Sequence, residues 1–220
     1  MTLVATGLGR DYPTPHGPLT VLHAVDLQLA AGETVAIVGP SGSGKSTLLG
    51  LLAGLDRPSR GSILIEGRDP ATMSDREASA FRAARMGFIF QSHRLLPALT
   101  AQENVATPLE LAGATDAGPR ARAWLDRVGL GGRHDHRPRQ LSGGEQQRVA
   151  VARALAHDPA IVFADEPTGS LDQRTGAAVA DLLFSLARER NATLVLVTHD
   201  ENLAARCARI VRMQDGRIAG

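Results

Sequence analysis

The nine residues GPSGSGKST, at positions 39–47, constrain the fold of this chain more than any other stretch. They follow an apolar run, ETVAIVG at 33–39, and they open a helical pattern, KSTLLGLLAGL. The spacing G-x-x-x-x-G-K-[ST] between a buried strand and a helix is typical of a loop that wraps a phosphate group. Its glycines let successive backbone N–H groups face one anion, and the N-terminus of the helix adds its dipole. This phosphate loop predicts a nucleotide-binding α/β fold.

Lys45 is the only lysine among the 24 Lys and Arg residues of the chain. A compact ammonium on a flexible stem can reach back over a tight loop to the β- and γ-phosphates, whereas a planar guanidinium needs a wider, fork-shaped partner. Chance alone would place a single lysine here about one time in 24. We expect Ser46 to offer its hydroxyl to Mg²⁺. The rest of the loop is expected to hold the phosphates: Gly39, Pro40, Ser41, Gly42, Ser43, Gly44 and Thr47.

Two further apolar runs, AIVFADE at 160–166 and ATLVLVTHD at 192–200, are apolar on both alternating faces. Such runs are typical of strands buried in a parallel sheet, and each precedes a helical pattern. Apolar and polar residues instead alternate, between turn glycines, in the first 30 or so residues and in GSILIEG at 61–67. This alternation favours antiparallel strands. The pattern predicts an α/β fold whose ligands gather at the carboxyl ends of the parallel strands.

Residues from about 92 to 140 carry helical patterns, TAQENVATPLELAG and PRARAWLDRVGL, without a strand signal. We therefore expect a helical lobe inserted into the sheet domain, packed around Trp124. The predicted organisation is a single domain over residues 1–220. Residues 1–91 and 158–220 form its sheet core and antiparallel lobe, and about 92–157 form the helical lobe.

Composition excludes several classes of protein. A hydrophobic content of 43% fits a soluble globular chain, and a net charge of +1 without a long basic run argues against nucleic-acid binding. No signal-peptide pattern is visible, and no apolar run approaches the ~20 residues that cross a bilayer, so we expect a cytoplasmic chain. Cys207, the only cysteine, excludes an internal disulfide, and we expect it to be an inert packed thiol.

Two adjacent carboxylates end the second apolar run. Asp165 is expected to approach Mg²⁺, directly or through its hydration shell, and Glu166 to orient the attacking water or accept its proton. The alternative is an acid that caps a helix before Pro167. We favour the catalytic interpretation, because an unpaired Asp–Glu pair is costly at the end of such an apolar strand without a cation.

His199 and Gln91 follow apolar strands in the same way, in VLVTHD and MGFIFQ. His199 could contact a γ-phosphate and hold the acid that orients water, and Gln91 could touch the metal or the water and report this to the helical lobe. A structural role is the alternative for each. His134 and His136, in RHDHRP, lack the further ligands that a metal site needs, so we expect them to be solvated.

Ser142 and Glu145, in LSGGEQQR, form a capping box that opens a helix. Gly143 and Gly144 weaken a first helical turn but let the backbone approach an anion closely. The chain already has a phosphate loop of its own. We therefore expect this helix end to bind the γ-phosphate held by a second copy, so that ATP joins a two-fold dimer.

These motifs, GPSGSGKST, FQ, LSGGEQQR, ADEPTGSLD and THD, occur in the order found in the ATP-binding cassette subunit of ABC transporters, and the resemblance covers essentially the whole chain. It implies a P-loop NTPase fold with a RecA-like mixed sheet core, an N-terminal antiparallel β lobe and an inserted helical lobe. By this resemblance Tyr12 corresponds to the aromatic residue that stacks on adenine, the alternative being packing. The same resemblance supports the roles of Gln91, Ser142, Gly144, Asp165, Glu166 and His199 and adds Asp172 to the nucleotide site. Ser170 replaces an asparagine that relatives often carry.

Within the family, GFIFQSHRLLPALTAQENVATPLELAG and EQQRVAVARAL resemble the small cassettes of the lipoprotein-releasing, macrolide-export and cell-division group, most of all the YbbA type. The resemblance implies an ATP-hydrolysing subunit at the cytoplasmic face of the inner membrane. Its expected partners are a second copy of itself and a separate permease with a large periplasmic portion, which exports or extracts a lipophilic or lipoprotein-like substrate.

Two other functions are alternatives to that of a transporter subunit. A soluble ATPase of ribosomes or DNA would carry two cassettes in one chain or a long coiled coil, and neither fits 220 residues. A cell-division-type switch, which actuates a periplasmic hydrolase instead of moving cargo, stays open as the alternative.

Overall fold

A computed structural model describes residues 1–219, which form two compact units. The first unit consists of Met1–Arg82 and the segment from Thr193 onward, and the second of Ala83–Ala192. The lobe boundaries expected at 91/92 and 157/158 both lie within the second unit, and the predicted single-domain organisation stays a prediction.

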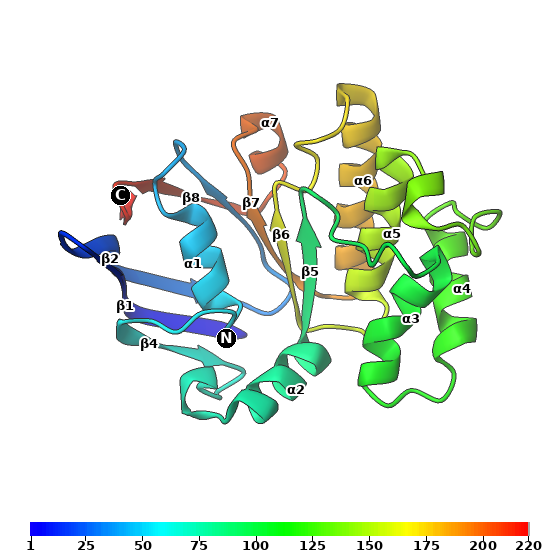
Figure 1. Ribbon diagram of the computed structural model, residues 1–220. Coiled ribbons are helices and arrows are strands. Elements are labelled where there is room, and N and C mark those ends of the chain that lie inside the picture. Colours follow the sequence, from blue (N-terminus) through cyan, green and yellow to red (C-terminus); the bar gives the residue numbers. More distant parts are fainter. Residues whose placement is uncertain (220) are drawn as a thin grey trace. The chain divides into compact units, whose positions relative to one another are not determined.

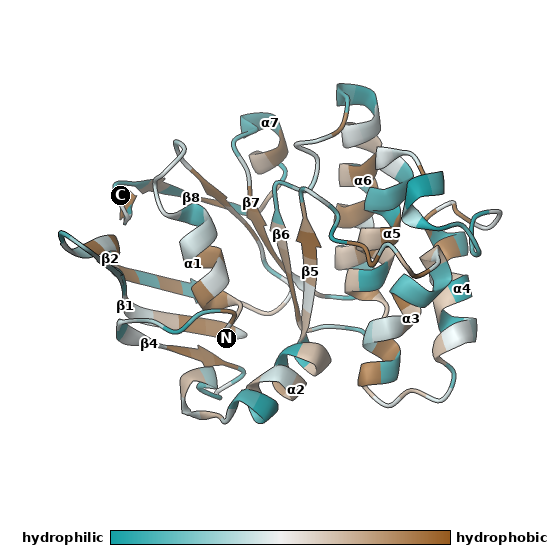
Figure 2. Cartoon of the chain, in the orientation of Figure 1, coloured by the Kyte–Doolittle hydropathy of each residue, from teal (hydrophilic) through white to brown (hydrophobic). Residues whose placement is uncertain are grey.

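The first unit contains a three-stranded antiparallel sheet. β1 (Leu3–Thr14) pairs with β2 (Gly17–Leu29) on one side and with β4 (Arg60–Ile65) on the other. Buried and exposed residues alternate strictly along the second half of β2, from Val25 to Leu29, as the sequence pattern predicts. Figure 2 shows hydrophobic and hydrophilic residues interspersed along this sheet. The β1–β2 hairpin turns at Thr14–Gly17.

The same unit holds the strands around the phosphate loop (Figure 1). β3 (Thr34–Val38) lies between β7 (Thr193–Val197) and β8 (Arg209–Gln214), parallel to both, and β9 (Arg217–Ala219) is antiparallel to β8. α1 (Lys45–Leu52) follows β3 and buries four leucines. Because β3 has paired strands on both sides and is almost fully buried, the position of the loop that follows it is well fixed.

Two helices of the chain differ from expectation. α7 (Glu201–Ala204) is only four residues long, whereas the pattern ENLAARCA predicts a longer helix; tight turns at Arg206 and Cys207 replace its second half. α2 (Asp75–Arg85), which follows the short η1 (Pro70–Thr72), was not expected from the sequence. It buries only Ala78 and Phe81, so few large apolar residues mark its buried face.

The second unit pairs β5 (Met86–Phe90) with β6 (Ile161–Asp165) in parallel and carries the expected helices. These are α3 (Ala101–Leu111), α4 (Ala117–Arg127), α5 (Gly143–Leu155) and α6 (Gln173–Glu189), with η2 (Pro138–Gln140) before α5. α5 packs against the other three helices and against β5. Contact with β5 is so close that a side chain at Gly87 would collide with the carbonyl of Ala154. Trp124 is buried in this unit, as expected.

The single thiol is packed rather than reactive. Cys207 lies against Ala36, Val38 and Ala204, and burial raises the pKa of its thiol to about 11. Only the thiolate attacks, so at pH 8 we expect a thiol reagent to modify Cys207 roughly 100-fold more slowly than a free cysteine. The rate should still be rising at pH 10. A rate that levels off near pH 9 in a stopped-flow titration would contradict this.

Candidate functional site

The phosphate loop connects β3 to α1 through three glycines with positive φ: +154° at Gly39, +81° at Gly42 and +93° at Gly44. A Cβ at Gly39 would collide with the carbonyl oxygen of Met213 in β8, and one at Gly44 would lie 2.8 Å from a methyl group of Leu22. Gly44 is also the N-cap of α1 and leaves its first N–H groups without a side-chain cap. The loop therefore presents backbone amides at a helix N-terminus, the arrangement that binds phosphate.

Lys45 is the first residue of α1, and its side chain curls back over the loop. Its Nζ atom donates hydrogen bonds to the carbonyl oxygens of Gly39, at 2.9 Å, and Pro40, at 2.8 Å. The ammonium thus lies over the loop, and its predicted contact with the β- and γ-phosphates stays a prediction. Beside it, Ser43 is only 3% exposed, and its hydroxyl oxygen has no hydrogen-bond partner among the described residues.

His199 lies near the loop in the first unit. It follows β7 and lines, together with Gly39 and Pro40, a cavity of about 560 Å³ that also reaches Arg212. The structure therefore brings His199 and the start of the phosphate loop to one cavity. Its predicted contact with a γ-phosphate stays a prediction.

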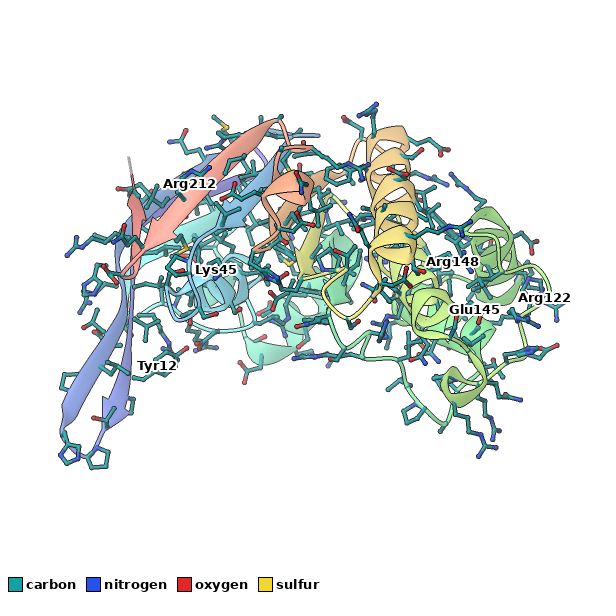
Figure 3. All side chains as sticks on the ribbon, turned by 90° about the horizontal axis from the view of Figure 1, so that it is seen from above. Tyr12, Lys45, Arg122, Glu145, Arg148 and Arg212 are labelled. Carbon is teal, nitrogen blue, oxygen red and sulfur yellow. The ribbon has the colours of Figure 1, made fainter. Side chains whose placement is uncertain are left out.

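Tyr12 lies on the β1–β2 hairpin, while Lys45 lies at the start of α1 in the same unit (Figure 3). The hydroxyl of Tyr12 donates to a carboxylate oxygen of Asp56 at 3.2 Å, and the guanidinium carbon of Arg10 lies 4.5 Å from the centroid of the Tyr12 ring. One face of the ring is thus covered by a cation, so an adenine would stack on the opposite face or displace Arg10.

The second unit brings the other catalytic candidates together. Phe90 pairs with Asp165 in the β5–β6 ladder, so Gln91 and Glu166 leave the same edge at neighbouring positions. A Cβ placed on Gly169 would lie 3.0 Å from the amide nitrogen of Gln91 and 3.5 Å from the Cβ of Glu166. The side chains of Gln91 and Glu166 therefore both lie close to Gly169.

Glu166 has a φ of +46°, a left-handed conformation that a residue with a Cβ rarely adopts. Such a conformation costs of the order of 1–3 kcal/mol, persists only where the surroundings impose it, and is concentrated at active sites. Its neighbour Asp165 still has the extended backbone of β6, so the chain turns sharply between the two acidic residues.

Ser142 caps α5, and the predicted capping box is present. Its hydroxyl oxygen accepts from the N–H of Glu145 at 3.3 Å, while a carboxylate oxygen of Glu145 accepts from the Ser142 N–H at 2.8 Å. The backbone N–H and then the hydroxyl of Ser142 hold the pKa of Glu145 below its usual value. Ser142 and Gly143 are exposed at this helix end.

Gly144 has a packing reason that the sequence argument did not include, because a Cβ there would collide with the methyl group of Thr175 in α6. Asp172 is the N-cap of α6 and accepts from the Thr175 N–H at 3.0 Å. Hydrogen bonds from Thr175 lower the pKa of Asp172. The structure thus assigns Asp172 a capping role; its predicted place in a nucleotide site is not tested by these contacts.

His134 makes a hydrogen bond of 2.8 Å with Asp126, and residues 1–219 contain no group of three or more His, Cys, Asp or Glu side chains arranged for a metal ion. No helix within the same range is both long and apolar enough to span a bilayer. Sequence reasoning missed Gln147 and Arg153 of α5, which contact the segments around Gln91 and Glu166. A glutamine in helical register with Val151 and Leu155, on an apolar face, was the available signal.

Similarity to known proteins identifies the family of this chain. The ABC transporter family matches residues 22–169, about two thirds of the chain. The chain belongs to the ABC transporter family. The cassette is 52% identical over 202 residues to the uncharacterized ABC transporter ATP-binding protein YbbA of Escherichia coli K12. The aligned residues cover 91% of this chain and 89% of that protein.

Two further relatives have named systems. The lipoprotein-releasing system ATP-binding protein LolD 2 of Caulobacter vibrioides is 47% identical, and the alignment covers 98% of this chain and 96% of that protein. The macrolide export ATP-binding/permease protein MacB 1/2 of Paracoccus denitrificans is 50% identical over 96% of this chain, which spans 32% of that protein. The dimeric post-hydrolysis structure of the cassette MJ0796 with ADP and Pi has a TM-score of 0.91 and 40% identity, covering 99% and 97% of the two chains.

These findings confirm the resemblance, the group of cassettes and the predicted P-loop cassette fold. They also confirm that the chain is the ATP-hydrolysing cassette of an ABC transporter. The roles of individual residues are not tested by them.

Proposed function

We propose that this cassette binds ATP with Mg²⁺ at the phosphate loop, pairs with a second copy around the nucleotide, and uses hydrolysis to drive a separate membrane permease. The observation that carries the proposal is the loop itself. Three left-handed glycines, an uncapped helix N-terminus and the ammonium of Lys45 over two loop carbonyls form a site for a polyphosphate. Titration of the purified chain with ATP tests it directly.

The donors offered to Mg²⁺ are chemically suited to it. Ser46 supplies a hydroxyl, Gln91 an amide oxygen and Asp165 a carboxylate, all of them hard oxygen donors of the kind that Mg²⁺ prefers. Mg²⁺ held there would neutralise charge on the phosphate oxygens. Ser46 belongs to the first unit, and the other two to the second.

In the proposed reaction Glu166 orients the water that attacks the γ-phosphate and accepts its proton. Gln91 senses the same position from the neighbouring strand end, and His199, which lines one cavity with Gly39 and Pro40, would contact the phosphate. Support comes from the shared position of Gln91 and Glu166 beside Gly169, and from the cavity shared by His199 and the loop.

Pairing of two copies is supported by the exposed Ser142–Gly143 end of α5 and by the dimeric state of the 40% identical cassette MJ0796. In the proposed dimer, the Ser142–Gly144 turn of each copy completes the nucleotide site on the other. Its amides then stabilise the γ-phosphate through the helix N-terminus.

The proposed partner beyond the dimer is an integral membrane permease with a large periplasmic portion, engaged through the Gln91–Leu111 region. The cassette would then act at the cytoplasmic face of the inner membrane. Support comes from the names of the relatives, one from a lipoprotein-releasing system and one a fused ATP-binding/permease protein for macrolide export. Export or extraction of a lipophilic substrate is proposed on this ground. The mechanical switch of the cell-division type stays an untested alternative.

Lys45→Ala should weaken ATP binding about 10- to 100-fold, because it removes charge-assisted hydrogen bonds worth roughly 1.5–3 kcal/mol. Lys45→Arg should recover little of this, since the guanidinium does not fit the loop. Arg76→Ala, an exposed position that loses the same charge, is the control and should bind as the wild type does. Unchanged affinity of Lys45→Ala in a calorimetric titration would contradict the role of the lysine.

A further inference from the structure

Gln147 lies in the middle of α5 and is completely buried. Its amide nitrogen donates a hydrogen bond of 2.6 Å to the carbonyl oxygen of Pro167 and lies 3.5 Å from that of Phe90. Its amide oxygen is buried and has no hydrogen-bond partner among the described residues. Only the donor half of this side chain is therefore used.

The two carbonyl groups belong to the segments that carry the catalytic candidates. Phe90 immediately precedes Gln91, and Pro167 immediately follows Glu166. One side-chain nitrogen from α5 therefore reaches both segments next to their functional residues. Since Glu166 has a left-handed backbone conformation, its direction depends on contacts of this kind from its surroundings.

A second residue of α5 holds the chain beyond Gln91. His93 and Arg94 have φ values of +59° and +46°, and their carbonyl oxygens accept hydrogen bonds from the guanidinium of Arg153, at 2.9 Å and 2.7 Å. The guanidinium of Arg94 lies 4.1 Å from the ring centroid of Phe90. A tight, strained turn after Gln91 is thus attached to the same helix.

The two halves of the Gln147 amide have opposite effects on stability. Its N–H group satisfies the buried carbonyl oxygen of Pro167, while its own buried oxygen, without a partner among the described residues, costs about 1–3 kcal/mol. Gln147 lies five residues beyond Ser142, a rise of roughly 7.5 Å along one uninterrupted helix whose Glu145 and Arg148 are labelled in Figure 3. A shift of the Ser142–Gly144 turn would therefore move Gln147 with it.

We propose that Gln147 is a positioning residue that links closure at the Ser142–Gly144 turn to the placement of Gln91 and Glu166, through the carbonyl groups of Phe90 and Pro167. This inference rests on the proposed function. When the turn engages a nucleotide on a second copy, α5 sets the two catalytic segments through Gln147, and Arg153 holds the turn after Gln91 in place. Gln147 itself touches neither nucleotide nor water.

The test is a kinetic comparison of Gln147→Met with the wild type, because methionine keeps the unbranched shape and removes the donor. We expect kcat for ATP hydrolysis to fall about 10- to 100-fold, since a misplacement of about 1 Å at a catalytic group costs that much. KM for ATP should stay within about twofold, and circular dichroism should show that the variant remains folded at the assay temperature. Gln146→Met is the matched control, because the Gln146 side chain donates to the carbonyl oxygen of Leu141, just before α5, and not to the segments around Gln91 and Glu166; its kcat should match the wild type.

A second measurement separates positioning from folding and from failure of the proposed function. In the Glu166→Gln background, the Gln147→Met variant should still form an ATP-dependent dimer. If Gln147→Met does not fold, Gln147→Leu takes its place. A kcat within twofold of the wild type, or a parallel rise in KM, would overturn the inference while leaving the proposed function intact. A wild-type chain that neither binds nor hydrolyses ATP would instead overturn the proposed function.

Discussion

Glu166→Gln is expected to lower steady-state ATP turnover by about 10²- to 10⁴-fold, the usual contribution of a positioned general base. Glutamine has almost the same shape and keeps a hydrogen-bonding oxygen, but it cannot accept the proton of the attacking water. ATP affinity should remain close to that of the wild type, since the phosphate loop and Lys45 are unchanged. Release of inorganic phosphate under saturating ATP and Mg²⁺ measures the effect.

The same variant should remain a dimer in the presence of ATP, because hydrolysis is the step that reopens the pair. Size-exclusion chromatography with light scattering distinguishes the two masses. Asp135→Asn, at an exposed carboxylate outside the regions with a proposed role, is the control for loss of a negative charge and should turn over normally. Rapid turnover by Glu166→Gln would show that another group serves as the base.

Ser142→Arg is expected to abolish ATP-dependent dimerisation and, with it, nearly all hydrolysis, while each single chain still binds ATP. Arginine loses the cap of α5, worth about 1 kcal/mol, and places a long side chain over the backbone amides of the Ser142–Gly144 turn. The larger effect is steric, because the turn must approach a phosphate closely to bind it.

Ser142→Thr is the matched control for this experiment. Threonine keeps the hydroxyl that accepts from the Glu145 N–H, so it should retain the capping box, the dimer and most of the turnover. If Ser142→Arg still dimerises with ATP and hydrolyses it, the turn does not belong to the nucleotide site of a second copy.

Much of the site could be predicted from local sequence, because its parts are set by short-range rules. The phosphate loop needs glycines at fixed spacing between a strand and a helix, and the cap of α5 needs Ser142 with Glu145; both are found as predicted. Strands β3, β6 and β7 were visible because burial on both faces makes them apolar throughout.

What escaped prediction depends on contacts between distant segments. The collision that requires glycine at position 144 involves Thr175 in α6, a separate helix. Gln147 bonds to residues far away in the chain, and its sequence signal is a single polar residue on an apolar helical face. α2 buries only two side chains, so the sequence offers few large apolar residues to mark it as a helix of the core.

A structure of the Glu166→Gln cassette with ATP and Mg²⁺ bound would show whether a second copy completes the nucleotide site. We expect two copies, with ATP on each phosphate loop and the Ser142–Gly144 turn of the other copy in contact with its γ-phosphate. A turn that lies far from any bound ATP, in a protein whose single chains hydrolyse ATP at the full rate in solution, would contradict this expectation.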